Sequence, residues 1–126
     1  MPYLGRWIRH GDWYPDTKLR LFKKAFGECG GKEPHDRVYV TGEVRRLRGE
    51  LFHYTYTDIE DQLATINRFS TISARTNDTE GRSVSMFDLI FRPTFRFIRG
   101  YVFKLGFLDG VPGLIVARNV AFGTFA

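Results

Sequence analysis

The spacing of apolar residues along the chain changes near residue 57. Before this point, apolar and polar residues alternate in three short runs, at residues 18–22, 37–41 and 50–56. Such alternation is typical of strands with one apolar face, so three strands are predicted. The glycine-rich stretch at 27–34 predicts a flexible loop that leads into the second of them.

After Thr57 the apolar residues recur at helical intervals. Thr57 and Glu60 have the spacing of a capping box, which predicts a helix start. The helix is expected over residues 58–77, with apolar positions Ile59, Leu63, Ile66 and Phe69 on one face.

Two further helical segments are predicted toward the end of the chain. Ser85 and Asp88 indicate another helix start, and Pro93 is expected to separate a short piece from a longer one. Pro112 suits the first turn of a last helix. In the longer piece the apolar face carries Phe95, Ile98, Val102 and Leu105, and the other face carries Arg92, Arg96 and Arg99.

These patterns predict an α+β chain in two parts. Residues 1–56 are expected to be rich in short strands, and residues 57–126 to form a helical subdomain. With 126 residues, the chain has the length of one modest domain.

Composition limits the cellular location and the classes of binding partner. The net charge of +5 favours an anionic partner. The positive charge is dispersed and no nucleic-acid recognition motif is present, so nucleic acid is disfavoured. The single cysteine, Cys29, excludes an internal disulfide and predicts a cytoplasmic protein. No uninterrupted apolar run reaches the roughly 18–20 residues that span a bilayer.

His35 and Asp36 are the first candidate for chemistry. A carboxylate beside an imidazole, placed over a bound sugar, could take the proton from an acceptor hydroxyl. Taken alone, the same pair is more typical of a solvated loop.

A second candidate group lies just upstream. Lys18 and Arg20 alternate on one strand face and could hold a diphosphate or an anionic acceptor, while Trp13 and Tyr14 could stack on a sugar. The alternative is an edge strand with its charges in water and a tryptophan that closes a small core.

His53, among aromatic residues at the predicted strand 50–56, is a candidate metal ligand. No cysteine or histidine stands at zinc-ligand spacing from it, and a histidine in such a place also serves as a core residue.

The basic, aromatic segment after Ser85 allows two interpretations. Arg92, Arg96 and Arg99 opposite an apolar face match a helix that lies on an anionic membrane. The alternative is a helix that packs its apolar side on the preceding helix and leaves the arginines in solvent.

An ordered series of segments resembles the C-terminal half of bacterial family 2 glycosyltransferases, the branch that includes lipopolysaccharide core sugar transferases. The series consists of residues 13–22 (WYPDTKLRLF), His35-Asp36, residues 47–56 (LRGELFHYTY) and residues 100–110 (GYVFKLGFLDG). The resemblance implies part of a GT-A fold, namely strands from the acceptor side followed by a C-terminal helical subdomain.

The resemblance also implies roles for single residues. Asp36 takes the place of the catalytic base of an inverting transfer, although this branch more often carries glutamate there. His53 matches a late histidine that completes the metal and diphosphate site, and Arg20 is the expected acceptor contact. The implied cofactor of the complete enzyme is Mg²⁺ or Mn²⁺. Its implied partners are a nucleotide sugar and a lipid-linked or envelope glycan acceptor, at the inner face of the cytoplasmic membrane.

The sequence also lacks two motifs of that family. No Asp-x-Asp-type motif and no glycine-rich nucleotide-binding turn occurs in it. The donor-binding half is therefore expected to be missing, and the chain is expected to be a fragment or one piece of a split enzyme that does not transfer sugar alone. The competing hypothesis is a non-catalytic module that binds a membrane surface or another protein.

Overall fold

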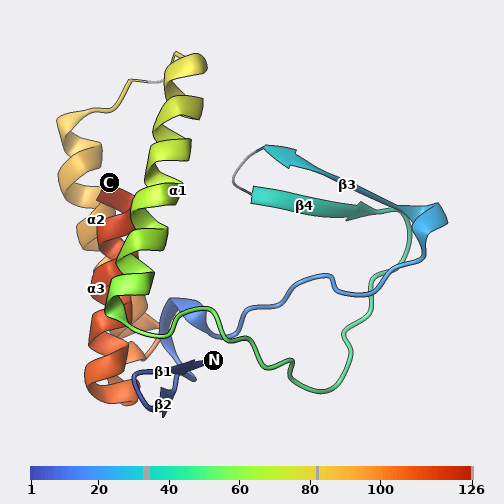
Figure 1. Cartoon of the computed structure of the whole chain (residues 1–126), viewed down its shortest axis with the longest axis horizontal. Coiled ribbons are helices and arrows are strands. Elements are labelled where there is room, and N and C mark those ends of the chain that lie inside the picture. Colours follow the sequence, from blue (N-terminus) through green and yellow to red (C-terminus); the bar gives the residue numbers. More distant parts are fainter. Residues whose placement is uncertain (33–34, 82, 126) are drawn as a thin grey trace. The chain divides into compact units, whose positions relative to one another are not determined.

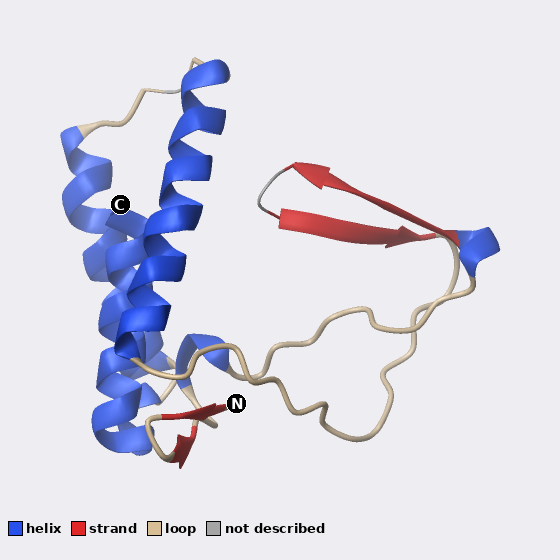
Figure 2. Ribbon diagram, in the orientation of Figure 1, coloured by secondary structure: helices blue, strands red, loops and turns tan. Residues whose placement is uncertain are grey.

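The computed structural model describes residues 1–32, 35–81 and 83–125, and it divides the chain into two compact units. The larger unit joins Met1–Asp16 to the C-terminal part from Phe52 onward, and the smaller unit is Thr17–Leu51. Helices and two small antiparallel sheets are both present, so the predicted α+β class is confirmed (Figure 2).

Three helices build most of the larger unit. They are α1 (Ile59–Thr79), α2 (Met86–Ile98) and α3 (Gly110–Phe125), and α3 packs against both of the others (Figure 1). A π-helical turn, η3 (Arg99–Phe103), and a 3₁₀ turn, η4 (Gly106–Asp109), connect α2 to α3.

The first residues of the chain complete this unit. Strands β1 (Pro2–Tyr3) and β2 (Arg6–Trp7) pair antiparallel, and the 3₁₀ turn η1 (Gly11–Trp13) follows. The buried core consists of Tyr3, Ile8 and Val116, with Trp13, Tyr56, Ile115 and Val120 packed around it. The core thus joins the first thirteen residues to α3.

The helix start predicted at Thr57 lies one residue later in the structure. Asp58 is the N-cap of α1, and its Oδ1 accepts a hydrogen bond of 2.8 Å from the amide of Asp61. The carboxylate of Asp61 in turn accepts from the amide of Thr57 at 3.1 Å. The helix itself is confirmed, since α1 begins one residue after the predicted start and extends two residues past the predicted end, to Thr79.

The capping box predicted at Ser85 and Asp88 is confirmed, and it starts α2. The prediction that Pro93 separates two helical pieces is wrong, because Pro93 lies inside α2. A proline removes one backbone hydrogen bond from a helix, but here the cap and the packing of α2 on α3 outweigh that loss.

The smaller unit contains one hairpin. Strand β3 (Gly27–Lys32) pairs antiparallel with β4 (His35–Val40), and the 3₁₀ turn η2 (Lys24–Phe26) precedes β3. The strand predicted at residues 37–41 is therefore confirmed, within one residue at its end.

Two predictions for the smaller unit are wrong. The stretch 27–34 was expected to be a loop, but pairing with β4 makes its first six residues a strand, and the Tyr39 ring lies over Gly30. Residues 18–22 form no strand in the described part of the chain, because no other segment pairs with them.

The strand predicted at residues 50–56 is wrong as well. This segment is irregular and is held by aromatic contacts instead of a strand ladder. The Trp7 ring centroid lies 5.1 Å from that of Phe52, and the Trp13 ring centroid lies 5.4 Å from that of Tyr56. Alternation of apolar residues here reflects contact with the N-terminal segment.

Two glycines allow the turn between α2 and α3 to pack tightly. A Cβ at Gly106 would lie 2.7 Å from the carbonyl oxygen of Gly100, and a Cβ at Gly113 would overlap the carbonyl oxygen of Gly106. Leu105 precedes this contact with a left-handed backbone, φ 58°. Only glycine at these positions lets the backbones approach so closely.

No individual helix among the described residues has the length and apolar character to cross a membrane. The pair formed by Met86–Phe103 and Gly106–Phe125 meets both criteria together, but it bends by 70° at its break.

Gly113→Ala should destabilise the larger unit by about 3 kcal/mol, because the new methyl group overlaps backbone that cannot move independently. Gly123→Ala is the matched control on the same helix, where the methyl would meet only the Ile66 side chain, at 3.3 Å. Urea unfolding should show a change below about 1 kcal/mol for the control. Equal losses in the two variants would contradict the glycine contact.

Candidate functional site

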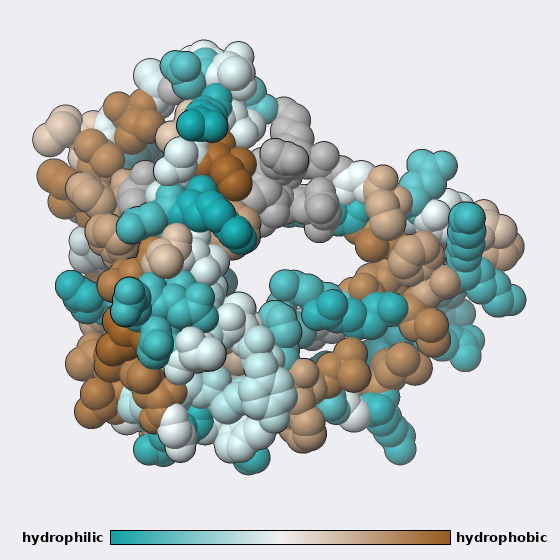
Figure 3. Space-filling view, in the orientation of Figure 1, coloured by the Kyte–Doolittle hydropathy of each residue, from teal (hydrophilic) through white to brown (hydrophobic). Residues whose placement is uncertain are grey.

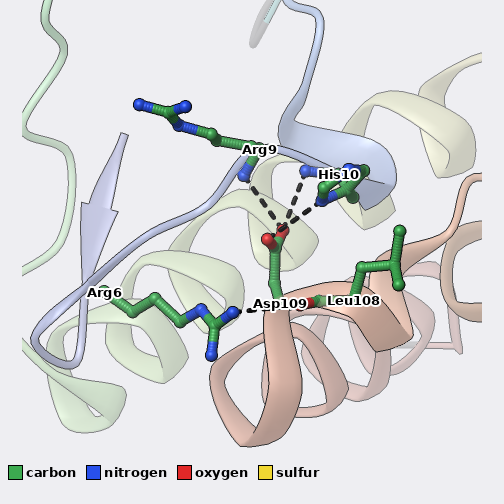
Figure 4. Close-up of polar contacts among 5 residues, drawn as sticks. All are labelled: Arg6, Arg9, His10, Leu108 and Asp109. Atoms are coloured by element: carbon green, nitrogen blue, oxygen red, sulfur yellow. Dashed lines mark hydrogen bonds and ion pairs between the residues drawn. The ribbon is translucent and has the colours of Figure 1, made fainter.

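Asp109 joins the first ten residues of the chain to the start of α3. Its side chain is 4% exposed, and Oδ2 accepts hydrogen bonds from the amides of Arg9 at 2.9 Å and His10 at 2.8 Å. Oδ1 lies 3.0 Å from Nδ1 of His10. Beside this carboxylate, the Arg6 guanidinium donates to the carbonyl oxygen of Leu108 at 3.1 Å (Figure 4).

The protonation of Asp109 follows from these contacts. Burial alone raises the pKa of the Asp109 carboxyl, but the hydrogen bonds from His10 and from the amide of Arg9 outweigh burial. The pKa therefore lies below its ordinary value. A carboxylate held in this way is ionised at neutral pH and fixes the backbone at residues 9 and 10.

A second buried carboxylate, Asp12, lies beneath three cations. Its side chain is 3% exposed, with Arg96 Nε 3.1 Å from Oδ2 and Lys104 Nζ 2.9 Å from Oδ1. Nη1 of Arg99 lies 4.0 Å from Oδ1. These contacts are ion pairs by distance, since neither Asp12 oxygen receives an aligned hydrogen bond within the described residues. A Cβ at Gly100 would lie 2.9 Å from Oδ2, so that glycine also makes room for the carboxylate.

A buried polar chain connects the N-terminal hairpin to α1 and α3. The Tyr3 hydroxyl donates to Oε1 of Gln62 at 2.5 Å, and Nδ2 of Asn119 donates to the same oxygen at 2.8 Å. Burial, followed by the nearby Asp58 charge, raises the pKa of Tyr3. The hydroxyl thus remains protonated and keeps its donor role.

An open depression of about 310 Å³ lies beside this chain of polar groups. It is lined by residues 2–5 and 54–57, which include the aromatic residues Tyr3, Tyr54 and Tyr56. Burial, followed by the Asp61 charge, raises the pKa of Tyr56, so its hydroxyl stays neutral and can donate a hydrogen bond. Tyr3 is buried, but the rings of Tyr54 and Tyr56 beside the hydroxyls of Thr55 and Thr57 suit stacking and hydrogen bonding with a sugar.

His53 lies next to this depression, on the exposed segment before α1. Its Nδ1 is 3.0 Å from Oγ1 of Thr55, which lines the depression. No group of three His, Cys, Asp or Glu side chains with metal-binding geometry occurs in the part of the chain that the structure describes. The described donors around His53 therefore do not fit a divalent metal centre by themselves.

Trp13 and Tyr14 also belong to the larger unit. The Trp13 ring packs edge-on to Tyr3, with centroids 5.1 Å apart, and against Tyr56. Trp13 therefore supports one wall of the depression, whereas Tyr14 is exposed.

The remaining sugar-site candidates lie in the smaller unit. Lys18 and Arg20 are exposed on the irregular segment before η2. His35 and Asp36 occupy the first two positions of β4, where they pair with Lys32 and Gly31; their side chains lie outside the described part. The structure thus divides the predicted residues between two separately described units.

The three arginines of α2 and η3 are not equivalent. Arg96 and Arg99 are directed at Asp12, while Arg92 is mostly exposed, with Nε 3.8 Å from Oδ1 of Asp88. The expected apolar side of the helix is exposed as well, including Phe95 at 61% and Ile98 at 40%. The sequence analysis offered two interpretations, a helix lying on a membrane and a helix packed on its neighbour. Neither included two arginines paired with Asp12 together with an exposed apolar side.

Sequence reasoning did not single out Asp12, Asp109 or His10. The two carboxylates contact residues more than eighty positions away, which no local pattern records. The sequence did contain one signal that Arg96 and Arg99 need a distant acidic partner. These arginines share a helix face, and no acidic residue lies four positions before or after either of them.

Comparison with known proteins relates this chain to glycosyltransferases. It is 28% identical over 109 residues to the lipopolysaccharide core biosynthesis glycosyltransferase LpsC of Rhizobium meliloti, which covers 85% of this chain. It is 26% and 25% identical to uncharacterized glycosyltransferases of Rickettsia prowazekii and Rickettsia typhi, over 84% and 85% of this chain. The chain spans about 40% of the length of these relatives. No family model and no solved structure matches it.

Asp109→Asn should destabilise the larger unit by about 1–2 kcal/mol at pH 7, because hydrogen bonds to a charged acceptor are replaced by weaker ones. The folded pKa of Asp109 lies below the unfolded value of about 3.9. Its contribution is therefore complete above that value and is lost as the pH falls through the folded pKa. In urea unfolding from pH 7 to pH 3, the difference between wild type and variant should shrink. Asp88, whose pKa is also lowered, is common to both proteins and cancels.

Asp12→Asn should leave three neighbouring cations without a counter-ion and destabilise the larger unit by about 1–2 kcal/mol. Raising the salt concentration to 0.5 M, roughly, should recover part of the loss, because salt screens the repulsion among partly exposed cations. Asp78→Asn, an exposed change on α1, is the control and should have no measurable effect. A loss that does not depend on salt would contradict the electrostatic role.

Proposed function

We propose that this chain supplies the acceptor-side part of a family 2, GT-A-type glycosyltransferase that builds lipopolysaccharide core or another envelope glycan. The observation that carries the proposal is the match to three glycosyltransferases over about 85% of the chain. The lipopolysaccharide core enters the proposal by analogy with the relative LpsC, whose name includes lipopolysaccharide core biosynthesis.

The depression in the larger unit supports a role in sugar binding. Its aromatic wall depends on Trp13 and Tyr56, and Thr55 is positioned by His53. In the proposed function this surface receives the acceptor glycan. Tyr14, which follows Trp13 in the sequence and is exposed, is a further proposed contact for the sugar. Arg20 and Lys18 on the smaller unit are the proposed contacts for anionic groups of the substrates.

Asp36 is the proposed general base. It would accept the proton of the acceptor hydroxyl while that oxygen attacks the anomeric carbon, and the bond to the nucleoside diphosphate breaks with its electron pair leaving on the diphosphate. His35 would contact the substrate beside it. Loss of such a base typically reduces the rate by about 10²–10⁴-fold.

A divalent cation, Mg²⁺ or Mn²⁺, would offset the charge of the leaving diphosphate in the complete enzyme. The described residues near His53 do not form a metal centre by themselves. In this proposal, the nucleotide sugar and the metal bind chiefly to a donor-binding part of the complete enzyme. That part corresponds to the segment of the relatives that this chain does not match. The chain alone is then not expected to transfer sugar.

A chimeric enzyme tests this proposal. The segment of LpsC that matches this chain is replaced by residues 1–126, and the chimera is expressed in Rhizobium meliloti that lacks LpsC. The expected result is restored lipopolysaccharide core, seen as normal gel mobility. Asp36→Asn in the chimera should abolish the restoration, because no base remains to activate the acceptor.

Asp78→Asn in the same chimera is the matched control, an exposed aspartate changed in the same way, and it should restore the core fully. A folded, expressed chimera that leaves the core truncated would contradict the proposed function. Full restoration by the Asp36→Asn chimera would contradict the assignment of the base.

A further inference from the structure

Helix α2 and the turn after it expose a continuous row of apolar side chains. Phe87, Phe91, Phe95, Ile98 and Val102, here called the apolar stripe, are spaced by three or four residues and therefore share one face. Each is between 40% and 65% exposed. Phe87 and Phe91 stack with ring centroids 4.1 Å apart.

The apolar stripe is not the face with which α2 packs. Leu89, Pro93, Phe97 and Gly100 are among the less exposed positions of α2 and η3, and they fall on a different side of the helix from the apolar stripe. Helix α2 is therefore apolar on two sides, one packed within the larger unit and one open. Figure 3 shows hydrophobic side chains gathered along the α2 side of the bundle.

Other apolar residues beyond α2 are exposed as well. Further exposed apolar residues follow in the turn to α3 and in its first residues: Phe103, Leu105, Phe107, Leu108 and Val111. The largest apolar patch on a typical monomer is about 300–600 Å² and is often functional, so this concentration of aromatic rings indicates a binding surface.

Charge indicates what covers this surface. Residues 82–126 carry six Arg and Lys against two Asp, a net charge of +4, whereas residues 57–81 carry two Arg against five Asp and Glu, a net charge of −3. Basic charge is thus concentrated on the same part of the chain as the apolar stripe. Arg92, mostly exposed, lies at the edge of the stripe. Arg96, Arg99 and Lys104 are ion-paired with Asp12 and contribute less.

We propose that the apolar stripe lies in the surface of an anionic lipid bilayer, with the phenylalanine rings among the acyl chains and Arg92 at the headgroups. An amphipathic helix with aromatic residues on one side and cations at its edge binds such surfaces by burial of apolar area together with attraction to anionic lipids. This reassigns the membrane contact from the three arginines to the aromatic side of the helix. The inference does not depend on sugar transfer.

Co-sedimentation of the full chain with vesicles tests the proposal. Vesicles of phosphatidylcholine alone are compared with vesicles that also contain phosphatidylglycerol, at low and at high salt. Wild type should bind the anionic vesicles at low salt and be largely released at high salt. The double variant Phe91→Ser and Phe95→Ser should bind at least tenfold more weakly.

Phe69→Ser on α1 is the matched control, since Phe69 is also an exposed helical phenylalanine. It should bind like wild type, and circular dichroism should show native helix content in all variants. Arg92→Gln should weaken binding at low salt more than at high salt.

Three results would overturn the proposal. They are no binding of wild type to anionic vesicles, equal weakening by Phe69→Ser, and a concentration-dependent dimer that the double variant abolishes while vesicles remain unbound. The last result would assign the apolar stripe to contact between two copies of the chain.

Discussion

The rest of the larger unit depends on the buried carboxylate of Asp109. It accepts hydrogen bonds from Arg9 and His10, about a hundred residues away in sequence, and so fixes the N-terminal segment where η4 gives way to α3. The hairpin β1–β2 then places Tyr3 in the core, and η1 places Asp12 beneath the cations of α2 and η3. The glycine contact between η4 and α3 holds Asp109 itself in position.

This arrangement gives α2 three different sides. One packs within the unit, one carries cations that are partly neutralised by Asp12, and one exposes the apolar stripe. Because Arg96 and Arg99 are engaged at Asp12, the orientation of α2 is fixed and the aromatic side is directed outward. A surface that would aggregate in most soluble domains is thereby presented as a defined face.

Sequence patterns correctly predicted the helix starts, which depend on contacts between residues close together in the sequence. The cap at Ser85 and Asp88, the helix after Thr57 and the helix near Pro112 needed only residues within one turn of each other, and all three are present. The strands at 18–22 and 50–56 were wrong because a strand needs a partner, and alternation does not show whether one exists. Asp12 and Asp109 were missed for the same reason, since their partners lie far along the chain. The roles of Asp36 and His53 came from resemblance and stay predictions.

The link between Arg9, His10 and Asp109 has a consequence for the order in which the molecule opens. Terminal residues of most domains exchange their amide hydrogens quickly, because they fray without disturbing anything else. Here the amides of Arg9, His10 and Gly11 are bonded to Asp109 and to the carbonyl of Lys104, so they open only when η3, η4 and α3 separate. The beginning of the chain and the helical turn some hundred residues later therefore form one cooperative unit, and slow exchange near the N-terminus is its signature.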